Sequence, residues 1–114
     1  MPPPSQIAIA TGSVNRLLKE EASYHKEIEQ EEAKIKVLKE KIDSGVDKDE
    51  NASYMLKQQQ TAVEQTKAVF APLREKIAVA VERLEEQLAM SEQLDASGDE
   101  VQQAREALAK ARET

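Results

Sequence analysis

Apolar residues recur every three or four positions along the first third of the chain, which is the spacing of a coiled-coil seam. One seven-residue register holds Ile7, Val14, Ile28, Ile35 and Ile42, and the same register displaced by three holds Ala10, Leu17, Tyr24 and Leu38. Each apolar side chain contributes roughly 1.5–3 kcal/mol, but only when a partner surface covers it. Because an isolated helix cannot cover such a stripe, the chain must supply partner helices.

The composition favours helices around a thin aliphatic core. The chain has 114 residues, of which 33% are charged and only 3% are aromatic. This balance is typical of long helices and coiled coils, and the length is that of one small domain. The absence of Cys excludes a disulfide framework and a thiolate metal site, and it suits a reducing compartment. We therefore expect an all-α fold in a single domain that spans residues 1–114.

The charge balance disfavours two classes of partner. The chain carries 22 acidic and 16 basic residues, spread along its length, for a net charge of −6. Nucleic-acid binding needs a basic stripe that displaces counterions, and anionic membranes also repel a chain of this sign. An apolar run of about 18 residues is missing, and the first five residues do not resemble a signal peptide. We expect a soluble cytoplasmic protein that binds neither nucleic acid nor membrane.

Gly and Pro divide the apolar pattern into three predicted helices, over about residues 6–43, 49–90 and 98–112. Ser5 is a candidate N-cap for the first helix, and Ser97 with Glu100 forms a capping box before the third. Short connections force the two long helices antiparallel. The predicted fold is an elongated antiparallel three-helix bundle, coiled-coil-like, with two long helices and one short one.

Four residues depart from the helical pattern. Pro72 lies inside the second predicted helix, where we expect it to kink that helix, with a division into two helices as the alternative. Glu21 and Glu31 interrupt the seam of the first helix, and we expect their stems to pack while their carboxylates reach water. Gly12 indicates either a helix that starts near residue 13 or the close approach of a partner backbone.

The chain lacks the residue patterns of an enzyme or a metal protein. His25 is the only histidine, and a bundle di-iron motif would need Glu at position 22, where the chain has Ala22. The phosphate-binding patterns GxxxxGK[ST] and GxGxxG are absent from the sequence. Neighbouring carboxylates such as Glu31 with Glu32, and Glu85 with Glu86, are expected to lie on solvated helix faces. We expect no enzymatic activity, no catalytic residue, no metal and no cofactor.

The N-terminal region combines seam and surface positions in one specific pattern. It reads Gln6-Ile7-Ala8-Ile9-Ala10-Thr11-Gly12, then Val14, Arg16-Leu17, Lys19-Glu20, Tyr24 and Lys26-Glu27, with further matches at Gln30, Glu32, Lys34-Ile35, Leu38 and Lys57-Gln58. A generic coiled coil would match mainly at the seam. This pattern resembles the tubulin-specific chaperone A family, also called tubulin-folding cofactor A.

The resemblance implies a three-helix bundle that captures β-tubulin folding intermediates after their release from the cytosolic chaperonin. Such a protein uses no nucleotide, holds its client for the other tubulin-folding cofactors, and works in the cytoplasm or beside the cytoskeleton. Outward positions within the matching region are the best tubulin-contact candidates, namely Arg16, Lys19, Glu20, Lys26 and Glu27.

Residues beside the seam leave two questions open. Leu18, Tyr54 and Met55 either supply apolar contacts to a client or pack against the third helix. Gln59 and Thr66 are polar residues on the apolar seam of the second predicted helix, and they leave room for dimerisation. Both a monomer and a homodimer therefore fit the sequence. The alternative function is therefore a structural coiled-coil adaptor or homo-oligomerising module without chaperone activity.

Overall fold

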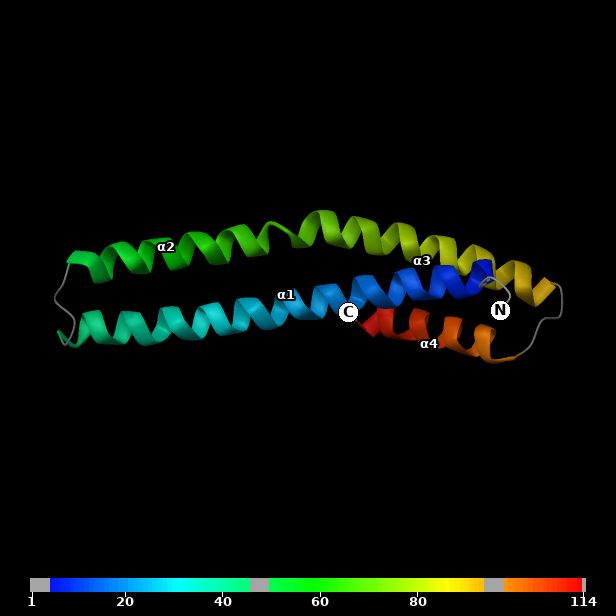
Figure 1. Ribbon diagram of the computed structural model, residues 1–114, viewed down its shortest axis with the longest axis horizontal. Coiled ribbons are helices and arrows are strands. Elements are labelled where there is room, and N and C mark those ends of the chain that lie inside the picture. The colour runs from blue at the N-terminus through cyan, green and yellow to red at the C-terminus, as the bar shows by residue number, and fades with distance from the viewer. Residues whose placement is uncertain (1–4, 46–49, 94–97, 114) are drawn as a thin grey trace. The chain divides into compact units, whose positions relative to one another are not determined.

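The structure, a computed structural model, describes residues 5–45, 50–93 and 98–113. These ranges contain four helices and no strand, which confirms the predicted all-α class. In chain order, as Figure 1 shows, the helices are α1 (Gln6–Asp43), α2 (Glu50–Lys67), α3 (Phe70–Gln93) and α4 (Asp99–Glu113). The predicted capping residue Ser97 and the predicted second-helix start at 49 lie outside the described residues.

Capping contacts are present at both ends of α1, and the first of them is the N-cap that the sequence predicts. The Ser5 hydroxyl oxygen accepts the backbone N–H of Ala8 at 3.2 Å, as an N-cap does. At the other end Gly45 adopts a φ of 77° and donates its N–H to the carbonyl of Ile42 at 3.1 Å. Gly12 lies well inside α1, and a Cβ atom built there would meet no atom within 4 Å. Neither expected reason for this glycine therefore applies.

The single helix expected over about 49–90 is divided into α2 and α3 by Ala68 and Val69. The backbone N–H of Val69 donates to the carbonyl of Thr66 at 3.1 Å. This bond spans three residues, so α2 ends in a turn of the 3₁₀ type. Pro72 becomes the third residue of α3, in a first turn whose N–H groups have no intrahelical acceptor. Inside one continuous helix the same proline would cost about 3 kcal/mol. The break removes that cost.

Substitution of Pro72 by Ala tests this account of the break. Because a proline in a first turn loses no hydrogen bond, we expect Pro72→Ala to change the free energy of unfolding by less than about 1 kcal/mol. Urea denaturation followed by circular dichroism gives the value. A gain near 3 kcal/mol would indicate instead that Pro72 strains the interior of one kinked helix.

Tertiary contacts group the chain into two compact units, and the single domain expected from length stays a prediction. The first unit comprises Met1–Glu21 with Pro72–Thr114, and the second comprises Ala22–Ala71. In the first unit the Ser5 hydroxyl bonds the Glu100 carboxylate, so α1 and α4 start side by side. Arg74, near the start of α3, lies against Glu21 instead, so α3 runs opposite to α1. Figure 1 shows these three helices lying along one another.

The core of the first unit receives side chains from all three of its helices. Val14 of α1, which belongs to the predicted seam, and Leu84 of α3 are fully buried. Val101, Ala104, Ala107 and Leu108 are the contribution of α4 to this core. The complete cluster is Ile7, Ala10, Val14, Leu84, Val101, Ala104, Ala107 and Leu108. The small side chains of α4 allow that helix to pack closely.

The second unit pairs the remainder of α1 with α2, and Figure 1 shows these two helices antiparallel. The ring of Phe70 stacks on the ring of His25 with centroids 4.4 Å apart, and it meets Tyr24 edge-on at 6.4 Å. These contacts fix Phe70 directly after the break. Lys67 and Glu32 form an ion pair at 3.5 Å, which contributes little because both side chains are about half exposed.

Candidate functional site

The five candidate contact residues are all exposed on α1. Arg16, Lys19 and Glu20 lie in the first unit, and Lys26 and Glu27 lie in the second. Arg16 Nε points back along its own helix and donates to the carbonyl of Gly12 at 3.4 Å. The other four side chains of this set lie at positions of α1 outside the seam. Their exposure makes them accessible to a partner, and their role as contacts stays a prediction.

The three apolar candidates beside the seam fall into two groups. Tyr54 is 60% exposed and Met55 is 44% exposed, so both are available to a partner. The Tyr54 hydroxyl oxygen accepts a hydrogen bond from Gln58 Nε2 at 2.8 Å. Leu18 instead packs against the core of the first unit, so packing explains that residue. Other exposed apolar side chains, which seam spacing did not indicate, are Ile9, Val37, Val79 and Met90.

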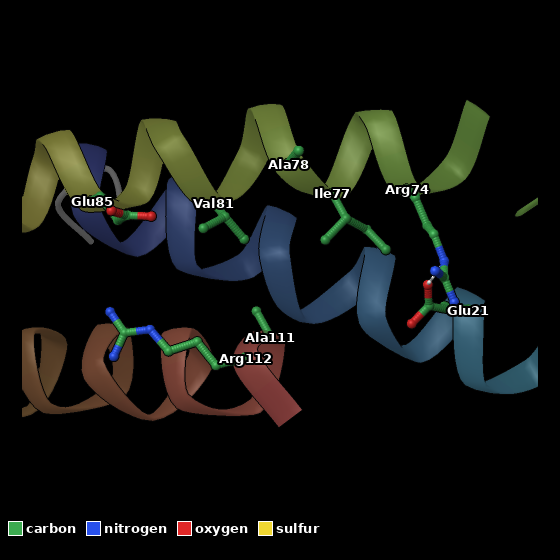
Figure 2. Close-up of a pocket in the computed structure, with 8 residues that line it drawn as sticks. All are labelled: Glu21, Arg74, Ile77, Ala78, Val81, Glu85, Ala111 and Arg112. Carbon is green, nitrogen blue, oxygen red and sulfur yellow. Dashed lines mark ion pairs between the residues drawn. The ribbon is translucent and has the colours of Figure 1, made fainter. Parts of the chain in front are cut away.

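A hollow of about 300 Å³ in the first unit brings charged side chains of three helices together (Figure 2). Two carboxylates, Glu21 and Glu85, and two guanidinium groups, Arg74 and Arg112, line it with apolar residues between them. The number of positive charges equals the number of negative ones, and neither a nucleophile nor an imidazole is among the lining residues. The hollow is therefore a charge-balanced junction between helices rather than a reaction site.

The carboxylates at the seam differ from the expectation that they reach water. Glu21 is only 4% exposed, and its Oε2 atom lies 3.8 Å from Arg74 Nε, as Figure 2 shows. Glu31, in the second unit, is half-buried; its Oε1 lies 3.5 Å from the Thr66 hydroxyl, while its Oε2 is buried and has no hydrogen-bond partner among the described residues. Both carboxylates lie where a facing helix covers them, which the seam rule alone does not reveal.

Substitutions of Glu21 and of Arg74 are expected to change the free energy of unfolding differently. Arg74→Ala leaves a buried carboxylate without its cation, so we expect a loss of about 1 kcal/mol in the free energy of unfolding, moderated because Arg74 itself is well exposed. Glu21→Leu removes the buried charge and leaves Arg74 in water, so we expect equal or higher stability. Urea denaturation of both variants measures the difference. A larger loss for Glu21→Leu than for Arg74→Ala would contradict this reading.

The described residues place the candidate side chains on helix surfaces. They contain no group of three or more His, Cys, Asp or Glu side chains able to hold a metal ion. Within the same residues, no helix has both the length and the apolar character needed to cross a membrane. The candidate residues lie on an outer helix surface, and the hollow between Glu21, Glu85, Arg74 and Arg112 is balanced in charge. The fold is that of a helical protein whose candidate contact residues are exposed on its surface.

Comparisons with known proteins identify the family of this helical protein. The family model described as tubulin binding cofactor A matches residues 2–108. Tubulin-specific chaperone A of Saccharomyces cerevisiae is 37% identical over 83 residues, which are 73% of this chain and 72% of that protein. The crystal structure of tubulin folding cofactor A from Arabidopsis thaliana superimposes with a TM-score of 0.77 at 28% identity, covering 95% of this chain and 94% of that one. The chain belongs to the tubulin binding cofactor A family, and the resemblance inferred from its N-terminal pattern is confirmed.

Proposed function

We propose that this protein is a tubulin chaperone that binds β-tubulin folding intermediates after their release from the chaperonin, and holds them without ATP. The observation that carries the proposal is the family match, which extends over residues 2–108 and includes all the candidate contact residues. The absence of phosphate-binding patterns from the sequence supports action without nucleotide. The protein would then act in the cytoplasm and hand its client on to other tubulin-folding cofactors.

Binding alone can protect a folding intermediate. An intermediate aggregates through exposed apolar surface, and a partner that covers this surface lowers the concentration of the free, aggregating species by mass action. A surface rich in charge keeps the resulting complex in solution. The exposed side chains of Tyr54 and Met55 supply apolar contact, while the charged surface of α1 provides the solubility.

We assign the tubulin-contact surface to Arg16, Lys19, Glu20, Lys26 and Glu27. Their exposure and their place in the family-specific N-terminal pattern support the assignment. Because the set carries both signs of charge, it can pair with a client surface of mixed charge and select its orientation. Exposed charges of this kind act mainly on association rate and specificity, so we expect capture to weaken as salt is added.

A structural coiled-coil adaptor is the second candidate function. The observation that favours it is the seam of the second unit, where Ile28, Ile35 and Leu56 stay half-buried and could be covered by a second copy of the chain. Monomer and homodimer are both compatible with the proposed chaperone. A dimer that forms at working concentration and loses no client surface would fit the chaperone, whereas a dimer that binds no tubulin would fit the adaptor.

The protection of β-tubulin in the absence of nucleotide tests the proposed function. Newly chaperonin-released β-tubulin is separated from ATP, incubated with or without this chain, and centrifuged at intervals. We expect the chain to keep β-tubulin in the supernatant in proportion to its concentration, because protection depends on binding. An unrelated acidic helical protein is the control. Protection that requires ATP, or none above the control, would contradict the proposal.

A further inference from the structure

The two units of the chain cover their seams to different degrees. In the first unit α4 is a third helix, and with it Val14 and Leu84 are fully buried. The second unit contains only the later part of α1 and α2 as described helices, apart from the first residues of α3. Its buried apolar residues are the small side chains Ala52 and Val63, while seam residues such as Ile35 remain half-buried. One side of this helix pair is therefore incompletely covered.

A groove of about 470 Å³ runs along the second unit between α1 and α2. Its walls include Ala33, Val37 and Leu38 from α1 and Met55 from α2. Val37 is 52% exposed and Met55 is 44% exposed, so their apolar surfaces are open to a partner. An amphipathic helix is the partner that fits such a groove, since residues at i, i+3, i+4 and i+7 can fill it from one face.

The charges around this groove indicate the sign of the charge that a partner must carry. Lys34 and Lys41 line the groove itself. The segment that contains them, residues 33–41, carries four lysines against one acidic residue, Glu40, although the chain as a whole has a net charge of −6. A partner helix with acidic flanks would therefore be attracted to this segment and oriented by it.

Buried acceptors at one end of the groove require a hydrogen-bond donor. Gln59 lines both the groove and a smaller adjoining cavity of about 150 Å³, which Glu31 also lines. Gln59 Oε1 and Glu31 Oε2 are buried and have no hydrogen-bond partner among the residues that the structure describes. A buried acceptor without a donor destabilises the fold, so a partner side chain that donates there would gain affinity.

We propose that this groove binds an acidic amphipathic helix of the β-tubulin folding intermediate. The client helix takes the third position beside α1 and α2, its apolar stripe covers Val37 and Met55, and its carboxylates face Lys34 and Lys41. A side chain of the client helix with an N–H or O–H group donates to Gln59 Oε1 at the end of the groove where Gln59 lies. The inference rests on the proposed function, because it names where and by which kind of segment the client is held.

Matched substitutions in the full-length chain test the groove by capture of newly released β-tubulin. The apolar variant is Val37→Ser with Met55→Ser, and its control is Val79→Ser with Met90→Ser, which are also exposed and lie in the first unit. The charge variant is Lys34→Glu with Lys41→Glu, and its control is Lys76→Glu with Lys110→Glu. We expect each groove variant to lower the affinity for β-tubulin about tenfold or more, and each control to change it by less than about twofold.

A photo-cross-linker identifies the occupant of the groove. Since the chain has no cysteine, Val37→Cys provides a single attachment point for a benzophenone maleimide, and Val79→Cys provides the control. We expect position 37, and not position 79, to cross-link an acidic amphipathic helical segment of β-tubulin. Cross-linking to a second copy of this chain, or to a basic or non-helical segment, would overturn the proposal.

The outcomes separate the groove from the function it rests on. If the unmodified chain captures no β-tubulin, the proposed function fails and the groove inference fails with it. If the unmodified chain captures β-tubulin and the groove variants capture it equally well, the groove inference alone is overturned. Circular dichroism of each variant shows that a loss of capture is not a loss of fold.

Discussion

Leu84→Ala is expected to lower the free energy of unfolding by about 2–5 kcal/mol, the largest stability effect of any single change we predict. Leu84 lies on α3 with none of its surface exposed, between side chains of α1 and α4. Truncation removes buried apolar surface and leaves a cavity that three packed helices cannot close without moving. Because domains of this size are stable by only about 5–15 kcal/mol, this loss would be a large part of the total.

Urea denaturation followed by circular dichroism measures this loss. A matched pair of valines in the same unit provides the control for burial: Val14 is fully buried, whereas Val79 is 57% exposed. We expect Val14→Ala to be clearly destabilising and Val79→Ala to change stability by less than about 0.5 kcal/mol. If Leu84→Ala costs no more than Val79→Ala, the three-helix core described for the first unit is not the core in solution.

The combined variant Arg16→Ala, Lys19→Ala and Lys26→Ala is expected to weaken the capture of β-tubulin by about tenfold or more. All three side chains are exposed, so their removal should leave the helices intact. The control carries Lys76→Ala, Arg83→Ala and Lys110→Ala, which are also exposed side chains and remove the same number of positive charges. Affinity is measured with newly chaperonin-released β-tubulin at low and at physiological salt.

The control variant separates a contact surface from a general effect of charge. If the N-terminal surface of α1 contacts the client, the control should retain capture while the first variant loses it. An equal loss in both variants would show that capture depends on net charge alone. Retention of capture by both would remove Arg16, Lys19 and Lys26 from the candidate site.

The sequence predicts the helices well because their signals are local. Seam spacing and the Ser5 cap lie within a few residues of the features they determine, and both are present in the structure. The break at Ala68 and Val69 needed more information. Pro72 indicates a defect, but a kink and a break both relieve it, and the choice depends on contacts across the helix pair such as the rings of Phe70 and His25.

The surface features show the same limit. Register alone predicts that the five charged candidates are exposed, because exposure follows from position on one helix. The burial of Glu21 could not be predicted in this way, since its ion pair comes from Arg74, fifty-three residues further along the chain. The groove beside Val37 is similarly formed by two helices, and the sequence indicated Leu38, Met55 and Gln59 separately but not that they line one groove. Pairing between distant segments is the information that a single sequence lacks.

Capture of β-tubulin tests the proposed chaperone function most directly. Purified chain is mixed with newly chaperonin-released α-tubulin or β-tubulin in the absence of ATP, and the complexes are separated by size. The account predicts a stable complex with β-tubulin that forms without nucleotide, and little or none with α-tubulin. Failure to form a complex with either tubulin would contradict the chaperone function and favour the coiled-coil adaptor.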